Sequence, residues 1–331
     1  MLAAVDVGYG FSKGAAQNGR RSVISSTIAG VTAARGLGQV FGKEARDGHE
    51  VQLSVAGQVS AFTVGASSGQ RSWAADAAER SGYAALVYAT LRLLGARSPV
   101  HLALGLPLAL WLQAPQRKGL RAKFRGVAAD ISLDGDPPLA IEIENAWVYP
   151  QGAGALAWVM RSDPSLATKP AGLIDVGYKT TDYLLMRRVD GAVVPDEPAC
   201  GSIDIGVGMV YERARQVLSE RTGALIPEGA VEDALRNYDG SLYIRGDLQD
   251  VRSIVAQQAA VLATSIADQM RRLWTDRLDL LGAVLIGGGG GELVFEHLRG
   301  VHPLTSLVPD ALYANALGFL EMARQAAGAS V

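Results

Sequence analysis

Two aspartates, Asp6 and Asp175, each follow an apolar run and precede a glycine in a turn. Residues 5–13 read Val-Asp-Val-Gly-Tyr-Gly-Phe-Ser-Lys, and residues 174–182 read Ile-Asp-Val-Gly-Tyr-Lys-Thr-Thr-Asp. A carboxylate at the end of an apolar strand must be paired or solvated. Carboxylate oxygens are also the ligands that a hydrated Mg²⁺ prefers. The matched pair favours a magnesium site over the alternative that each aspartate caps an ordinary β-turn.

The residues that follow each aspartate are suited to hold phosphate. Glycine lets the chain turn tightly, and consecutive backbone N–H groups in such a turn can point at phosphate oxygens. Lys13 adds a positive charge to the first turn, and the second turn carries two threonines. We therefore predict a phosphate-binding loop after each aspartate.

A run of five glycines, Gly287–Gly291, follows a third apolar strand and precedes a helix-like segment. Backbone without side chains permits close approach of a ligand, and a helix N-terminus favours a phosphate or a sugar. The alternative is a plain strand-to-helix turn. The sequence contains neither G-x4-GK[ST] nor G-x-G-x-x-G, so neither a P-loop nor a dinucleotide-binding fold is indicated.

Gln151 follows Pro150 at the start of a helix rich in small residues. A neutral amide near a terminal phosphate can orient an attacking water, because phosphoryl transfer depends mostly on positioning and charge neutralisation. The alternative is a solvent-facing residue at a helix N-terminus. We predict Gln151 and Asp175 as the catalytic residues.

Two internal repeats divide the chain into halves. The first is the pair of Asp-containing segments, and the second relates Tyr149-Pro-Gln-Gly-Ala-Gly-Ala-Leu to Tyr313-Ala-Asn-Ala-Leu-Gly-Phe-Leu. The two repeats have nearly the same offset and occur in the same order, which predicts two lobes of one design.

Alternating strand-like and helix-like segments predict an α/β fold. The predicted strands cover 2–6, 100–106, 139–148, 172–188 and 282–286, and the predicted helices cover 76–94, 116–124, 152–160, 206–221, 250–278 and 313–326. In the helix over 250–278, one apolar stripe is predicted, formed by Val251, Ile254, Val255, Val261, Leu262, Ile266, Met270 and Leu273. Segments 24–75 and 222–250 read as small insertions, the first of them rich in β-structure.

Composition excludes several classes of protein. The formal net charge of the 331 residues is −2, which argues against a globally basic surface that binds nucleic acid directly. The single cysteine, Cys200, precludes an internal disulfide and fits a reducing cytoplasm. The sequence has no apolar stretch long enough for a spanning helix, no signal-peptide pattern and no amphipathic N-terminus, so we expect no membrane association.

Taken in order, these segments resemble the actin, sugar-kinase and heat-shock ATPase superfamily. The aspartate segments match its two phosphate loops, the glycine run its adenosine loop, and the second repeat its two connecting helices. Within the superfamily the chain is similar to actin-like proteins of the plasmid-segregation type, ParM or StbA, through Phe62-Thr-Val-Gly65, Leu104-Gly-Leu-Pro107 and Val148-Tyr-Pro-Gln-Gly-Ala-Gly154.

The resemblance implies a two-lobed actin-like ATPase fold, with a duplicated ribonuclease-H-like core and small inserted subdomains. It predicts an N-terminal lobe over 1–160, with the helix of 313–331 packed back on it, and a C-terminal lobe over 161–312. ATP or ADP would sit between the lobes with Mg²⁺, held through water by Asp6 and Asp175. The implied nucleotide-binding residues are Gly8, Tyr9, Gly10, Ser12, Lys13, Gly177, Tyr178, Lys179, Thr180, Thr181, Gly287, Gly288, Gly289 and Gly290.

The resemblance also implies a biological role. Subunits would stack head to tail into filaments, hydrolysis would destabilise the polymer, and a DNA-binding adaptor would link it to a plasmid or other DNA. One alternative is a sugar- or acid-kinase of the same superfamily, with Asp182 as its base. A chaperone-like ATPase would need a further substrate-binding domain, and a scaffold without catalysis would not need both aspartates and Gln151.

Overall fold

The computed structural model describes residues 1–30, 48–66, 69–71 and 82–328. The chain divides into two compact units. Unit 1 comprises Met1–Ala157 and Asn315–Val331, and unit 2 comprises Trp158–Ala314. No helix among the described residues combines the length and the apolar character needed to cross a membrane.

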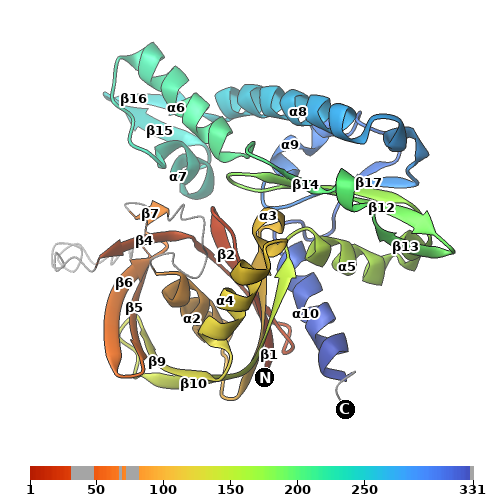
Figure 1. Cartoon of the computed structure of the whole chain (residues 1–331). Coiled ribbons are helices and arrows are strands. Elements are labelled where there is room, and N and C mark those ends of the chain that lie inside the picture. Colours follow the sequence, from red (N-terminus) through yellow and green to blue (C-terminus); the bar gives the residue numbers. More distant parts are fainter. Residues whose placement is uncertain (31–47, 67–68, 72–81, 329–331) are drawn as a thin grey trace. The chain divides into compact units, whose positions relative to one another are not determined.

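Unit 1 is built on one large sheet that curves around helix α2 (Figure 1). Its described strands run in the order β3-β2-β1-β8-β10-β9-β5-β6-β4-β7. Their bounds are β1 Leu2–Val7, β2 Phe11–Ala16, β3 Arg21–Ser25, β4 Thr27–Gly30, β5 His49–Val55, β6 Gln58–Val64, β7 Gln70–Arg71, β8 Val100–Leu106, β9 Val127–Leu133 and β10 Leu139–Pro150. Strands β1, β8 and β10 are parallel, and β2 and β3 extend the sheet in antiparallel fashion.

Some helices of unit 1 pack on this sheet, and two others, α5 and α10, contain the points where the chain changes units. Helix α2 is buried along most of its length, because its apolar residues meet β1, β8 and β10 in one core. The chain passes into unit 2 within α5 and returns at the start of α10. The helix bounds are α2 Tyr83–Leu93, α3 Leu108–Trp111, α4 Ala114–Phe124, α5 Ala153–Ser162 and α10 Ala314–Gly328.

Unit 2 is built on a smaller sheet of order β13-β12-β11-β17-β18, with β14 paired to β12. Every residue of β11 and β17 is buried, as expected for parallel strands covered on both faces. The strand bounds are β11 Ala171–Val176, β12 Thr181–Val189, β13 Ala192–Pro195, β14 Gly201–Ile203, β17 Ala283–Gly287 and β18 Thr305–Leu307.

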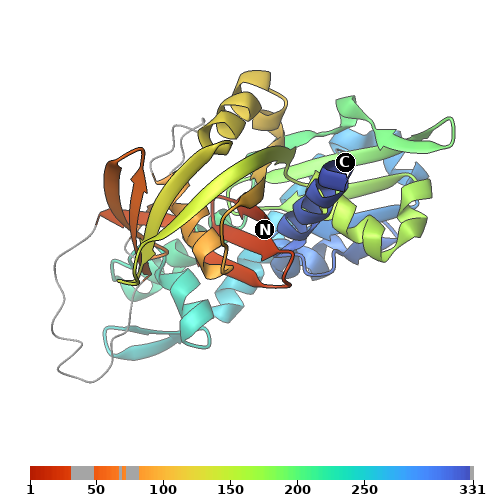
Figure 2. The same cartoon turned by 90° about the horizontal axis from the view of Figure 1, so that it is seen from below.

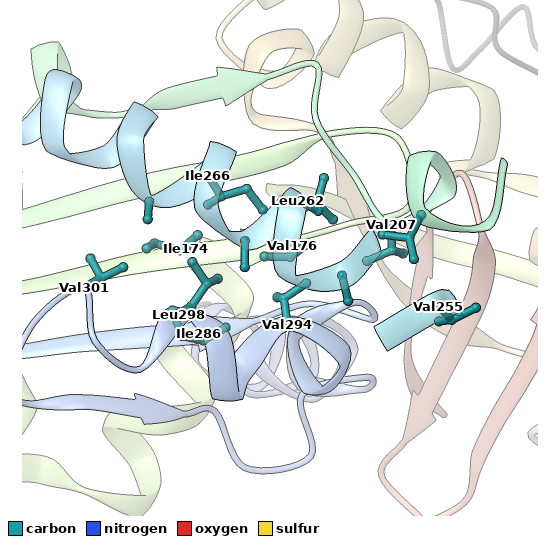
Figure 3. Packing of buried hydrophobic residues seen from close by; sticks show 14 of the residues in the cluster. Ile174, Val176, Val207, Val255, Leu262, Ile266, Ile286, Val294, Leu298 and Val301 are labelled. Atoms are coloured by element: carbon teal, nitrogen blue, oxygen red, sulfur yellow. The ribbon is translucent and has the colours of Figure 1, made fainter. Parts of the chain in front are cut away.

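The long helix α8 and the shorter helix α9 pack on the core of unit 2. Figure 3 shows Leu262 and Ile266 of α8 and Val294 and Leu298 of α9 gathered around Ile174 of β11. The helices are α6 Gly208–Thr222, α7 Ala230–Asn237, α8 Arg252–Trp274 and α9 Gly291–Leu298, and a separate two-stranded sheet consists of β15 Ser241–Ile244 and β16 Asp247–Asp250. Short 3-10 helices cover Pro164–Thr168, Glu197–Ala199 and Thr275–Leu280.

The same local arrangement occurs once in each unit. In unit 1, β1 forms a hairpin with β2 and runs parallel to β8. In unit 2, β11 forms a hairpin with β12 and runs parallel to β17. Asp6 and Asp175 occupy equivalent places near the ends of β1 and β11. The repeat visible in the sequence is therefore a repeat of strand pairing.

Two expectations about helices need correction. The predicted apolar stripe of the long helix includes Val261, but this residue is 61% exposed, because it is adjacent in sequence to Leu262 and so points about 100° away from it. The α-helix ends at Trp274 rather than at Leu278, since Thr275 adopts a positive φ of 42° and a 3-10 turn follows. Residues 76–81 of the predicted helix 76–94 lie outside the described residues.

Candidate functional site

Asp6, Lys13 and Gln151 meet at one point in unit 1. The Asp6 side chain is 2% exposed, and its Oδ2 accepts a hydrogen bond from Lys13 Nζ at 3.0 Å. Its Oδ1 accepts from Gln151 Nε2 at 2.6 Å. A buried carboxylate is tolerable only when it is paired and hydrogen-bonded, and here both oxygens are satisfied. Three residues that the sequence predicted for one site thus lie together.

The pairing of strands explains why these side chains meet. Asp6 and Lys13 are direct cross-strand partners in the β1–β2 hairpin. Gln151 lies at the end of β10, where its backbone N–H donates to the carbonyl of Leu106 at 2.8 Å. The carboxyl ends of parallel β1, β8 and β10 therefore bring Asp6 and Gln151 to one edge of the sheet.

Gly105 completes this group and was not predicted as part of it. A Cβ at position 105 would lie 2.7 Å from Asp6 Oδ1 and 2.6 Å from a ring carbon of Phe319. Glycine is the residue that leaves room for the carboxylate. The available signal was a lone glycine inside an apolar strand, which commonly marks close approach of another group.

The first predicted phosphate loop is a tight turn at the start of β2. The Gly8 N–H donates to the Phe11 carbonyl at 2.9 Å, which closes the turn. Ser12 is fully buried, and its hydroxyl lies 2.8 Å from the Thr90 hydroxyl on α2. The Ser12 hydroxyl therefore contacts α2 within unit 1. Tyr9 is half-buried and Gly10 is buried beside it.

In unit 2, Asp175 and the glycine run lie against one another. Asp175 is 7% exposed and pairs with Gly287 across the parallel strands β11 and β17. Gly288 has a φ of +83°, and a Cβ there would overlap both Asp175 Oδ1 and the Val176 carbonyl oxygen. Position 288 therefore requires glycine for conformation and for space. Gly290 N–H donates to the Val176 carbonyl at 2.9 Å, which ties the two strand ends together.

The second predicted phosphate loop rests on residues at the start of α6. Gly177 N–H donates to Thr180 O at 2.9 Å, Val207 N–H to Gly177 O at 3.0 Å, and Gly208 N–H to Tyr178 O at 2.8 Å. A Cβ at Gly206 would overlap the Tyr178 carbonyl oxygen. The Gly-Val-Gly segment over 206–208 was missed as part of this region, although two close glycines before a helix were a visible signal.

Side chains of the second loop point in different directions. Thr181 is fully buried, and its hydroxyl donates to the Ile205 carbonyl at 2.7 Å. Tyr178 lies over Tyr211, with ring centroids 6.2 Å apart, and its hydroxyl is 3.4 Å from the buried carboxylate of Glu232. These two side chains are thus part of the packing of unit 2. Lys179 and Thr180 are half-buried, and Gly289 is exposed.

The donor atoms in these groups suit Mg²⁺ better than a transition metal. Within the residues that the structure describes, no three His, Cys, Asp or Glu side chains cluster as a metal-ligand set. Asp6 and Asp175 each present carboxylate oxygens beside a glycine turn. Mg²⁺ is commonly held by one or two carboxylates, waters and nucleotide phosphates, so single carboxylates of this kind fit it.

Comparison with protein families and solved structures identifies the architecture. Residues 4–154 match the model of the N-terminal domain of actin-like proteins, and residues 173–300 match the model of the C-terminal domain of archaeal MreB-like actin homologues. No curated protein matches the sequence.

Solved structures match the chain over nearly its whole length. A 15-stranded ParM filament from Clostridium botulinum matches with a TM-score of 0.84 and 25% identity, covering 98% of this chain and 99% of that one. A non-polymerisable mutant of pCBH ParM matches with a TM-score of 0.81, 24% identity and the same coverage. The archaeal actin homologue Ta0583 in complex with ADP matches with a TM-score of 0.77 and 21% identity, again over 98% and 99% of the two chains.

The two family models together account for most of the chain, one in each half. The strand arrangement around Asp6 recurs around Asp175, as a duplicated core requires. The chain belongs to the actin-like proteins, and its fold is the two-lobed actin-like fold.

Proposed function

We propose that this protein is an actin-like ATPase, in which the groups around Asp6 and around Asp175 serve the binding and hydrolysis of Mg·ATP. The observation that carries the proposal is the 2.6 Å contact from Gln151 Nε2 to Asp6 Oδ1. It joins the two functional elements of unit 1 that the sequence singled out separately. The ADP complex of the similar protein Ta0583 supports a nucleotide as the ligand.

The geometry of Gln151 suits a residue that orients water. Its amide nitrogen is bound to Asp6, which fixes the side chain and leaves the amide oxygen to accept a hydrogen bond. An amide is too weak a base to deprotonate water, and phosphoryl transfer does not require a strong base. Bound Mg²⁺ would neutralise charge on the phosphates. Asp6 and Asp175 would hold its waters. Backbone N–H groups of residues 9–10 and 178–180 would donate to phosphate oxygens, since the Gly8 and Gly177 N–H groups already close their own turns.

Lys13 has a more specific role in this proposal than the sequence indicated. Its ammonium is 3.0 Å from Asp6 Oδ2 and both side chains are largely buried. Lys13 therefore compensates the negative charge of Asp6 within unit 1. Within the proposal it would also present positive charge to the phosphates from the same place.

Replacing Gln151 by alanine is expected to lower the rate of phosphate release about 10- to 100-fold, since a positioning contribution is lost while the phosphate loops remain. The measurement is phosphate release from Mg·ATP at saturating nucleotide. Gln113→Ala is the matched control, because Gln113 is an exposed glutamine of unit 1 whose Nε2 bonds only to the Ala109 carbonyl among the described residues. Equal rates for Gln151→Ala and the wild type would remove Gln151 from the mechanism.

We further propose that the protein assembles into filaments in the cytoplasm, that hydrolysis controls their stability, and that a DNA-binding adaptor links them to plasmid or other DNA. The similar ParM from Clostridium botulinum forms a 15-stranded filament, which supports self-association. The net charge of −2 gives no reason to expect direct binding of nucleic acid.

The kinase alternative receives less support. Its base would be Asp182, and this residue is 4% exposed on β12, where it pairs with Asp175 across the hairpin. A base for a sugar or acid acceptor must reach the acceptor's proton. Adding sugars and small carboxylic acids to Mg·ATP is therefore expected to leave the rate of ATP turnover unchanged. A strong stimulation by one acceptor, without polymer, would favour the kinase.

A further inference from the structure

We propose that Asn315 of α10 is a positioning residue for Gln151, acting through the N-terminus of α5. The inference rests on the proposed function, because it concerns how Gln151 is held for hydrolysis. All of the residues that carry it belong to unit 1.

The Asn315 side chain is bound to the start of α5. Its Oδ1 accepts a hydrogen bond from the Gly152 N–H at 2.8 Å and another from the Ala155 N–H at 3.2 Å. Asn315 is 8% exposed, so these bonds form away from bulk water. A buried amide oxygen with two backbone donors is a fixed contact rather than a surface one.

Helix α5 needs such a contact because its own cap residue lacks a side chain. The Gly152 carbonyl accepts the first helical hydrogen bond, from Leu156 N–H at 3.0 Å, so Gly152 is the N-cap. An N-cap side chain normally accepts from the N–H two or three residues later. Gly152, whose φ is +83°, has no side chain and therefore offers no such acceptor. Asn315 supplies the missing acceptor from a different helix.

Gln151 is the residue directly before this cap. Its backbone N–H is held by the Leu106 carbonyl at 2.8 Å, and its side chain donates to Asp6 at 2.6 Å. Asn315 therefore fixes the chain on the C-terminal side of Gln151, while β8 fixes it on the other. Loss of the Asn315 acceptor would free the Gly152 peptide and with it the direction of the Gln151 side chain.

Two glycines bring α10 close enough for this contact. A Cβ at Gly154 would lie 2.5 Å from the Asn315 carbonyl oxygen, and a Cβ at Gly318 would overlap the Gly154 carbonyl. Figures 1 and 2 show the start of α5 beside α10. The stacked rings of Tyr149 and Phe319, with centroids 6.0 Å apart, flank the same contact.

The internal repeat gives this arrangement a simple origin. In the alignment of Tyr149-Pro-Gln-Gly-Ala-Gly with Tyr313-Ala-Asn-Ala-Leu-Gly, Gln151 corresponds to Asn315 and Gly154 to Gly318. The corresponding glycines pack on each other, and the corresponding amides have different tasks. The first reaches Asp6, and the second caps the helix that follows the first.

The test uses Asn315→Leu, which keeps the size of the side chain but removes the acceptor, and Asn315→Asp, which keeps an acceptor oxygen. Steady-state hydrolysis of Mg·ATP is measured with the full-length protein, and the variants are compared at equal amounts of sedimentable polymer. We expect Asn315→Leu to lower kcat about 10-fold with KM changed less than about twofold, since only positioning is lost. Asn315→Asp is expected to restore most of kcat, because Asp is a good helix cap.

A double-mutant cycle separates positioning from stability. In a Gln151→Ala background, Asn315→Leu is expected to leave kcat unchanged, because the residue that it positions is absent. If Asn315 had only a structural role, Asn315→Leu would lower the urea midpoint in both backgrounds, and its effect on kcat would not depend on whether Gln151 is present. If Asn315→Leu does not fold, Asn315→Ser, which has a shorter acceptor, is used in the same cycle.

The outcomes are distinguishable. If Gln151→Ala hydrolyses ATP as fast as the wild type, the proposed role of Gln151 is wrong. If Gln151→Ala is slow but the Asn315 variants keep the wild-type kcat, or if the two effects on kcat are additive, the inference about Asn315 alone is overturned.

Discussion

Replacing Asp175 by alanine is expected to reduce phosphate release from Mg·ATP about 100-fold or more while leaving the fold intact. Asp175 is 7% exposed at the end of β11, beside a Gly288 backbone that only glycine permits. In the proposed function its carboxylate holds the waters of a hydrated cation, and loss of one preorganised charge at a reacting phosphate costs two or more orders of magnitude. The measurement is steady-state phosphate release, with the melting temperature and circular dichroism as checks of folding.

Asp279→Ala is the matched control for this experiment. Asp279 is an exposed aspartate of the same unit, and its removal is expected to leave both the rate and the melting temperature unchanged. Asp175→Asn keeps the shape of the side chain and is expected to be almost as slow as Asp175→Ala. Wild-type phosphate release by a folded Asp175→Ala variant would contradict the assignment.

Replacing Gly318 by alanine adds one methyl group to unit 1 and is expected to lower the free energy of unfolding strongly. The added Cβ would overlap the Gly154 carbonyl oxygen, and both partners are helix backbone that cannot move aside like a side chain. Overpacking of a fixed contact costs about 3 kcal/mol at the upper end of the usual range. The measurement is the free energy of unfolding from urea denaturation, with hydrolysis measured on the same sample.

Gly119→Ala provides the comparison with the opposite sign. Gly119 lies in α4, is exposed, and has no atom within 4 Å of an added Cβ. Alanine there is expected to stabilise the protein by about 0.5–1 kcal/mol through helix propensity. If Gly318→Ala is as harmless as Gly119→Ala, the close packing of α10 on α5 is wrong.

Local pattern was sufficient to predict most of the elements. The apolar runs over 2–6, 100–106 and 282–286 form buried strands because each is short, is rich in Val, Leu and Ile, and is bounded by turn residues. The helix over 250–278 was found from its apolar period, but its end was not, because Thr275 departs from helical geometry without a glycine or proline to mark it.

The contacts that shape the site were harder to predict, because they join residues far apart in the chain. Nothing local indicates that Gly105 makes room for Asp6, or that Asn315 caps a helix more than 150 positions earlier. The sequence also could not show that the Ser12 and Thr181 hydroxyls bond inside their own units. The sequence of a phosphate loop is the same whether its Ser or Thr hydroxyl points toward the ligand or into the core.

What could be inferred was the set of residue types and their order. The aspartates and the glycine run are recognisable from the sequence because a carboxylate in an apolar strand and repeated glycines both destabilise a fold unless they serve a purpose. Gln151 is recognisable from its place in the second internal repeat. Within unit 1, the structure brings Asp6, Lys13 and Gln151 into direct contact. Within unit 2, it brings Asp175 against Gly288.

Filament formation is tested by sedimentation of the purified protein with and without Mg·ATP, with phosphate release followed in the same tube. We expect polymer to pellet at high speed above a critical concentration when Mg·ATP is present, and phosphate release to accompany assembly. Asp175→Ala is expected to release little phosphate under the same conditions. Absence of sedimentable polymer with every nucleotide and salt condition would contradict the proposal that this actin-like protein forms filaments.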